Sequence, residues 1–155
     1  AYLMAAGLGT RLYPLTGLTS KPMVPILNRP VMEHIVRLLA RNGFTEVIAN
    51  IHWYPDAIKD HFGDGSGFGV DLSYSFEEEL HGTAGGVRFA SRFFDDDFLV
   101  ISGDAMTVIA KGPCAVPAGV QEMTPVCASM VIPAGELTRR YRIFAEASPL
   151  AWTSY

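Results

Sequence analysis

Apolar and polar residues follow two alternating periods along the first two thirds of the chain. Short apolar or alternating runs predict strands over residues 1–4, 46–51, 70–75 and 98–102. Helical spacing predicts one helix that begins after Pro30 and stops before Gly43, and further helices over 55–62 and 83–93. Strands that alternate with helices are typical of parallel strands joined by crossover helices, so we expect a doubly wound α/β sheet.

The pattern changes near residue 108. The last 47 residues hold five of the ten prolines and both cysteines, and they contain no aspartate, asparagine or histidine. No helical period survives between these prolines. The chain therefore divides into residues 1–108 and a tail of residues 109–155. The cysteines, Cys114 and Cys127, are too far apart for a CxxC site, and free thiols in a reducing cytoplasm are favoured over a disulfide.

Composition excludes some classes of function. A net charge of −4 gives no basic field for nucleic acid. The chain shows no apolar run near the roughly 20 residues that a membrane helix needs, and no charged leader followed by an apolar stretch. We therefore expect a cytoplasmic protein with neither a nucleic-acid nor a membrane partner.

The segment "AAGLGTR", residues 5–11, follows the first predicted strand. Glycines let backbone N–H groups approach an anion, so this loop could hold phosphate; alone, a glycine pair after a strand is more often a tight turn. Arg11 and Lys21 would add a planar fork and a point charge for phosphate oxygens, although both could be solvated surface cations. The loop matches neither the P-loop nor the dinucleotide pattern.

The motifs "GLGTRLYPLT", "SKPM" and "NRPVMEH" follow one another between residues 7 and 34. Together they closely resemble the signature of the sugar-nucleotide pyrophosphorylases, which are nucleotidyltransferases that make NDP-sugars. The chain departs mildly from that signature with Ala6 and Ser20. The resemblance covers residues 1 to about 108, which correspond to the N-terminal, nucleotide-binding half of that catalytic domain, and it implies an incomplete Rossmann-like, mostly parallel sheet with helices on both faces.

The resemblance also implies a reaction and a set of site residues. A sugar-1-phosphate oxygen attacks the α-phosphorus of a nucleoside triphosphate, and pyrophosphate leaves. Arg11 and Lys21 would be the catalytic cations, and Asp104, after the strand "FLVIS", would hold Mg²⁺. A single aspartate after a strand is otherwise more often a cap or a turn former. The triphosphate would lie against Ala6, Gly7, Gly9 and Thr10.

A base-recognition segment is implied within "FEEELHGTAGGV", residues 76–87, although an acidic run alone is typical of a solvated loop. By position, Gly82 and Thr83 would lie against the base and ribose, and Glu77 would read the base. A carboxylate only accepts hydrogen bonds, which suits the adjacent donors of guanine. This favours GTP. The run "GTAGG", residues 82–86, resembles the mannose-1-phosphate guanylyltransferase branch of the family, which implies mannose-1-phosphate as the sugar. UTP- or dTTP-dependent glucose-1-phosphate enzymes stay open, because Glu78 and Glu79 lie next to Glu77 and a one-residue slip in the match would change which residue reads the base.

The tail lacks the residues that the second half of the family's catalytic domain supplies for the sugar phosphate and the metal. Val108 stands where the family usually has another acid, Lys111 is the only lysine after Asp104, and residues 109–155 match nothing in the family. A shifted reading frame or a truncated gene would explain this. The alternatives for the chain itself are a non-catalytic nucleotide-binding fragment or a poorly folding one. Without later strands, we expect an exposed apolar sheet edge that promotes aggregation.

Overall fold

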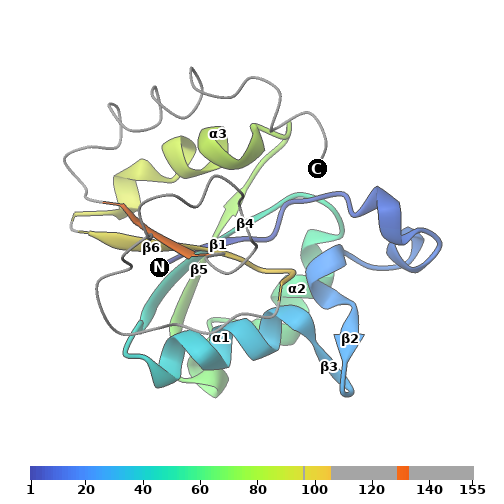
Figure 1. Cartoon of the computed structure of the whole chain (residues 1–155), viewed down its shortest axis with the longest axis horizontal. Coiled ribbons are helices and arrows are strands. Elements are labelled where there is room, and N and C mark those ends of the chain that lie inside the picture. Colours follow the sequence, from blue (N-terminus) through green and yellow to red (C-terminus); the bar gives the residue numbers. More distant parts are fainter. Residues whose placement is uncertain (96, 106–128, 133–155) are drawn as a thin grey trace, which may run out of the picture.

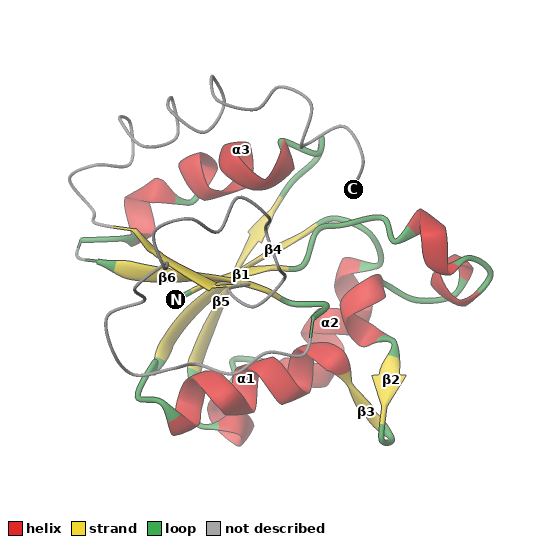
Figure 2. Cartoon of the chain, viewed as in Figure 1, coloured by secondary structure: helices red, strands yellow, loops and turns green. Residues whose placement is uncertain are grey.

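The computed structural model describes residues 1–95 and 97–105 in full and the backbone of residues 129–132. Five strands form one sheet in the order β5-β4-β1-β6-β7 (Figures 1 and 2). Helices α1 and α2 lie on one side of it and α3 on the other. The strands are β1 (Tyr2–Met4), β4 (Glu46–Ile51), β5 (Asp71–Phe76), β6 (Phe98–Ser102) and β7 (Ser129–Ile132), and the helices are α1 (Val31–Arg41), α2 (Pro55–Phe62) and α3 (Gly82–Phe89).

Strand β1 lies at the centre of the sheet and pairs in parallel with two neighbours. Tyr2 is in register with Ile48 of β4 on one side and with Val100 of β6 on the other. Strand β5 extends the sheet in parallel beyond β4. The chain thus builds outward from β1 to one edge and then crosses to β6, which confirms the predicted doubly wound, mostly parallel sheet.

Each face of the sheet carries its own apolar layer. Leu3, Ala49 and Ile101 point to the face covered by α1 and α2, where Ile35, Leu39, Ile58 and Phe62 pack against them. Tyr2, Ile48 and Val100 point to the other face, where Val87 of α3 and Ala90 cover them. Neighbouring residues in each strand serve opposite faces, which explains why β1, β4 and β6 carry consecutive apolar residues rather than an alternating pattern.

Two predicted boundaries differ from the structure. The helix expected over 83–93 ends at Phe89, and a separate 3₁₀ turn, η5, covers Ser91–Phe93. Tighter hydrogen bonds from Phe93 to Ala90 and from Phe94 to Ser91 replace the helical pattern there. The strand expected over 70–75 lies one residue further along, at Asp71–Phe76.

The sequence predicts an incomplete sheet with an exposed apolar edge. That edge does not lie at β6, because a further strand follows β6 in the sheet. Strand β7 pairs with β6 antiparallel, with Phe98 opposite Ile132 and Ile101 opposite Ser129. The tail therefore supplies a fifth strand at this edge, and a short apolar run between prolines gave no period from which to predict it. The tail's predicted features at Val108, Lys111, Cys114 and Cys127 lie outside the described residues.

A short hairpin was not predicted. Strands β2 (Pro25–Ile26) and β3 (Arg29–Pro30) pair antiparallel, and the two residues between them, Leu27 and Asn28, have φ of 53° and 62°. Two consecutive positive φ values are typical of the tight turns that match the twist of a hairpin. The hairpin leads directly from the Lys21 segment into α1.

No helix within the described part of the chain is both long and apolar enough to cross a membrane.

Candidate functional site

The candidate site lies where β1 and β6 end. Ligands of open α/β sheets bind at these carboxyl ends. The two loops that follow these strands are held together by Gly103, whose N–H donates to the Met4 carbonyl at 2.8 Å. A Cβ at Gly103 would lie 2.8 Å from the same oxygen, so only glycine permits this approach. The glycine loop after β1 and Asp104 after β6 are therefore neighbours.

The two glycines of the loop differ in their surroundings. Gly9 has φ of 65°, and a Cβ there would lie 2.8 Å from Thr16 Cγ2 and 2.9 Å from Lys21 Cβ. Thr16 Oγ1 donates to the Gly9 carbonyl at 2.9 Å, which ties the loop to the segment that follows. A Cβ at Gly7 would meet nothing within 4 Å. Gly9 is thus needed for the fold of the loop, whereas Gly7 leaves open space.

Lys21 and Asp104, which are 83 positions apart, form an ion pair. Ser102 Oγ also donates to the Asp104 carboxylate. Burial raises the pKa of Asp104, but the hydrogen bonds from Lys21 and Ser102 and the lysine charge outweigh burial and hold that pKa below its ordinary value. The Asp104 side chain is 24% exposed and that of Lys21 is 36% exposed, so both can still be reached from solvent.

The remaining residues of the predicted triphosphate loop differ in exposure. Ala6 is buried, while Gly7, Thr10 and Arg11 are exposed. Thr10 and Arg11 belong to a 3₁₀ turn, η1 (Thr10–Leu12), which begins directly after Gly9. The structure thus brings Gly9 of the loop, Lys21 and Asp104 together beyond the carboxyl ends of β1 and β6.

Glu77 lies at the end of β5 and is only 1% exposed. Its Oε1 accepts a hydrogen bond from Asn50 Nδ2 at 2.8 Å, and its Oε2 accepts one from the His81 N–H at 3.1 Å. The carboxylate therefore faces the protein interior in this structure. Gly82, with φ of 69°, and the half-buried Thr83 begin α3 further along the same segment.

Asn50 is a site residue that the sequence reasoning missed. Its Oδ1 accepts a hydrogen bond from the Ala5 N–H at 2.7 Å, and its amide donates to Glu77. Asn50 therefore joins the loop after β1 to the segment after β5. A buried asparagine near the end of the apolar run "EVIANI" was the available signal, because a buried amide needs partners.

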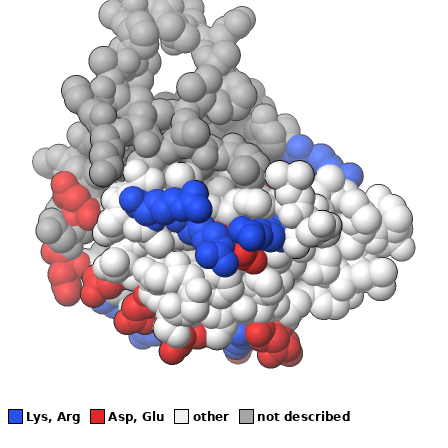
Figure 3. Space-filling model, turned by 90° about the horizontal axis from the view of Figure 1, so that it is seen from below, with Lys and Arg blue, Asp and Glu red and all other residues white. Residues whose placement is uncertain are grey.

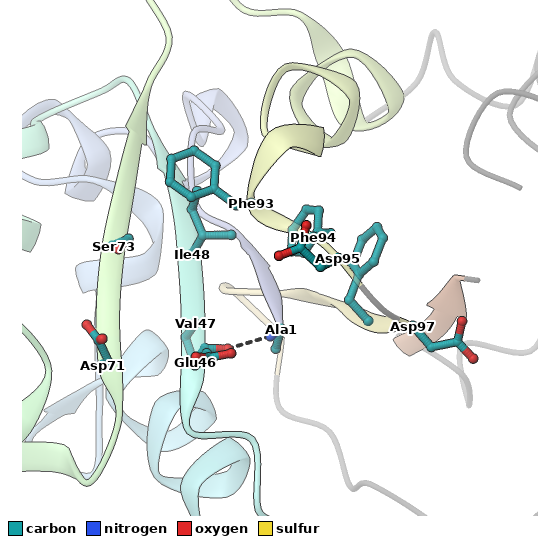
Figure 4. A pocket seen from close by; sticks show the side chains of 11 residues that line it. Ala1, Glu46, Val47, Ile48, Asp71, Ser73, Phe93, Phe94, Asp95 and Asp97 are labelled. Atoms are coloured by element: carbon teal, nitrogen blue, oxygen red, sulfur yellow. Dashed lines mark hydrogen bonds between the residues drawn. The ribbon is translucent and has the colours of Figure 1, made fainter. Parts of the chain in front are cut away.

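A separate hollow in the described structure lies at the opposite end of the strands (Figure 4). Its lining includes the first residues of β4, β5 and β6, namely Glu46, Asp71 and Phe98, together with Ala1. Those are the amino ends of parallel strands, away from the glycine loop. This hollow is therefore not part of the candidate site.

The donor set can be tested against Mg²⁺. Among the described residues, no group of three or more histidine, cysteine, aspartate or glutamate side chains could hold a metal ion. One accessible carboxylate, Asp104, does fit the usual mode of Mg²⁺ in phosphoryl chemistry, where one or two carboxylates, waters and substrate phosphates share the ion. The arrangement thus fits a metal that arrives with a phosphate ligand.

Comparison with known proteins agrees with this arrangement. The family model described as nucleotidyl transferase matches residues 1–116. A UTP–glucose-1-phosphate uridylyltransferase from Synechocystis sp. is 41% identical over 118 residues, covering 68% of this chain and 30% of the relative. A mannose-1-phosphate guanylyltransferase from Mycobacterium tuberculosis is 35% identical over 108 residues, covering 69% and 30%.

A solved structure supports the same assignment. HddC from Yersinia pseudotuberculosis, complexed with GMP-PN, has a TM-score of 0.59 and 30% identity over 66% of this chain and 46% of its own. The fold is that of a Rossmann-like α/β protein, with a glycine loop after its first strand. The chain belongs to the nucleotidyl transferase family, whose members among these relatives make NDP-sugars. It spans 30% of the length of the two sequence relatives.

Proposed function

We propose that the chain carries the nucleotide-binding half of an enzyme that joins a nucleoside triphosphate to a sugar-1-phosphate, giving an NDP-sugar and pyrophosphate. The observation that carries this proposal is the Lys21–Asp104 ion pair beside the glycine loop, at the carboxyl ends of β1 and β6. Transfer at a phosphorus atom needs alignment and charge neutralisation. A cation, a carboxylate and an exposed backbone loop at the carboxyl ends of the strands meet these needs.

Each residue has a proposed role toward the triphosphate. The backbone of Gly7, Gly9 and Thr10, next to Ala6, would line the phosphates, and Arg11 would neutralise the pyrophosphate as it leaves. Lys21 would leave Asp104 and stabilise the phosphorus that is attacked, by donating to the oxygens of the α-phosphate. Asp104 would hold the Mg²⁺, which supplies charge neutralisation of the phosphate oxygens. Gly82 and Thr83 would lie against base and ribose.

The base stays a prediction. GTP follows from reading Glu77 as an acceptor for guanine, and one relative and the HddC complex involve guanine nucleotides. The relative with 41% identity is a uridylyltransferase, and the inward-facing Glu77 carboxylate offers no exposed oxygen to guanine. Uridine is therefore the second candidate, and mannose-1-phosphate and glucose-1-phosphate are the corresponding sugars.

Nucleotide titration of the 155-residue chain tests the proposal. GTP, UTP and dTTP are titrated with and without Mg²⁺, and Kd is measured by calorimetry. We expect saturable binding that strengthens with Mg²⁺ in the wild type and falls by about tenfold or more in Lys21→Ala, because a charge-assisted phosphate contact is lost. Asp104→Asn keeps the shape but removes the charge, so binding should lose its Mg²⁺ dependence.

A matched control and a turnover assay complete the test. Lys59→Ala removes an exposed cation of α2, and its Kd should equal that of the wild type. With both substrates present, we expect no pyrophosphate release above background, because in the family the second half of the catalytic domain supplies the sugar-phosphate site. A wild-type chain that binds none of the three nucleotides would contradict the proposed function, and ordinary turnover would show that the tail completes the sugar site.

A further inference from the structure

A buried polar relay connects the two halves of the proposed nucleotide site. It begins at the Ala5 N–H, passes through the side chain of Asn50, and ends at the carboxylate of Glu77. Asn50 is 6% exposed and Glu77 is 1% exposed, so water does not complete these bonds. Ala5 is the first residue of the glycine loop, and Glu77 is the second residue of the base-recognition segment. The relay therefore spans from the triphosphate side to the base side.

The direction of each hydrogen bond is fixed by chemistry. The Ala5 N–H only donates, so it requires the oxygen of the Asn50 amide, and the NH₂ group must then face Glu77. Both oxygens of Glu77 are used, because Oε2 accepts from the His81 N–H. No member of the relay can reverse without setting two donors or two acceptors against each other.

Two further contacts and one glycine show that this arrangement is built into the fold. The Glu77 N–H donates to the Ile51 carbonyl at 3.0 Å, and His52 Nδ1 lies 2.8 Å from the Glu77 carbonyl. Gly86 of α3 leaves the space for the relay, since a Cβ there would lie 2.6 Å from Glu77 Oε1 and 3.0 Å from Asn50 Nδ2. The carboxylate is thus enclosed by β4, β5 and α3.

We propose that Asn50 and Glu77 act as a coupled pair of positioning residues that holds the triphosphate loop and the base segment in fixed relation. This proposal rests on the proposed function for its consequence in binding. It also gives Glu77 a role different from direct reading of the base. A reader would change the preference between bases, whereas a positioning residue affects every nucleoside triphosphate alike.

A reversed-polarity pair provides the test. Asn50→Asp keeps the acceptor for Ala5 but sets a second carboxylate against Glu77, and Glu77→Gln sets its amide NH₂ against that of Asn50. In the double variant, the new carboxylate at position 50 would accept from both the Ala5 N–H and the new amide at position 77. The oxygen of that amide would still accept from the His81 N–H. Every hydrogen bond is then restored with the same total charge. The exposed Glu78→Gln is the matched control.

Two measurements are made on the full chain. Calorimetry with Mg²⁺ gives Kd for GTP and UTP, and hydrogen exchange of the free protein reports on the peptide that contains residues 5–10. We expect each single variant to raise the Kd of GTP and of UTP by a similar factor of about tenfold. In the double variant, both Kd values should return to within about threefold of the wild type. Glu77→Gln should also speed exchange at residues 5–10, although it bonds none of them, and the double variant should slow it again.

The outcomes separate this proposal from the proposed function. Each of three results would overturn the coupling. They are a changed ratio of the GTP and UTP Kd values in Glu77→Gln, a loss of binding free energy in the double variant equal to the sum of the losses in the single variants, and unchanged hydrogen exchange at residues 5–10. If the wild type binds neither nucleotide, the proposed function fails, and the exchange measurement still decides the coupling. If a single variant fails to fold, recovery of folding in the double variant supports the pair, and its absence refutes it.

Discussion

Single glycines in this chain serve distinct physical purposes, which the sequence alone did not separate. Gly9 has a positive φ and is enclosed by Thr16 and Lys21, while Gly7 is exposed with open space around it. Both were predicted as phosphate-binding residues from the same motif. The motif indicated that backbone is exposed there, but contacts between the loop and residues 12 positions further along are tertiary and leave no mark on local sequence.

Alanine at Gly9 and at Gly7 should therefore have different effects. Gly9→Ala should lower the free energy of unfolding by about 1–2 kcal/mol or more, because a left-handed backbone and two close contacts oppose its Cβ. Gly7→Ala should leave stability near that of the wild type. Urea unfolding of both variants measures this, and equal stability of the two variants would contradict the assigned difference.

Glu33, a residue of the family signature, connects helix α1 to α2 and to the hairpin strand β3. The motif "NRPVMEH" was taken only as part of the family resemblance, yet Glu33 is 6% exposed and joins three elements. Its carboxylate accepts from Arg37 Nε at 2.8 Å within α1, lies 3.0 Å from His61 Nε2 of α2, and lies 3.8 Å from Arg29 Nε of β3. Seen from below the view of Figure 1, the described surface shows a group of Lys and Arg atoms with Asp or Glu atoms next to it (Figure 3).

The neighbouring His34 secures the hairpin. Its Nε2 lies 2.9 Å from the Ile26 carbonyl of β2. The hairpin was missed because two-residue strands are too short to show a period, whereas α1, α2, β4 and β6 were predicted with bounds close to those observed. Local pattern was thus sufficient for long elements and insufficient for the short ones that position Lys21.

Removing the charge of Glu33 should weaken the α1–α2 contact in a pH-dependent way. Burial raises the pKa of Glu33, but the hydrogen bonds and charges of Arg37 and His61 outweigh it and set that pKa below its ordinary value of 4.5. A depressed carboxyl pKa stabilises the fold above the unfolded-state value, and this stability is lost as pH falls through the folded-state value. Glu33→Gln should therefore cost about 1–3 kcal/mol at pH 7 and progressively less as pH falls below about 4.5.

Urea unfolding at pH 7 and at pH 4 or below measures this difference. Asp60→Asn, an exposed carboxylate of α2 for which we expect no such cost, is the control. A difference between wild type and Glu33→Gln that stays constant across this pH range would refute the role of the ionised carboxylate.

At the scale of the whole molecule, the sheet gathers residues that are distant in sequence. The parallel order alone predicts that the carboxyl ends of β1 and β6 lie at the same end of the sheet. The approach of the glycine loop to Asp104 could therefore be anticipated. The relay through Asn50 could not, because it depends on the register between β4, β1 and β5. Strand β7 was also unpredicted, since antiparallel pairing with β6 joins segments with no shared local signal.

Strand β7 should determine whether the chain stays monomeric. A chain that ends at residue 128 lacks β7 and leaves the β6 edge of an apolar strand unpaired, whereas a chain that ends at residue 140 keeps β7. Unpaired apolar edges template association with other chains, so the shorter chain should self-associate at concentrations where the longer one and the 155-residue chain do not. Size-exclusion chromatography with light scattering over a concentration series measures this. If neither truncated chain associates, the β6 edge needs no cover. Association of all three chains would support the sequence-based prediction of an aggregating edge.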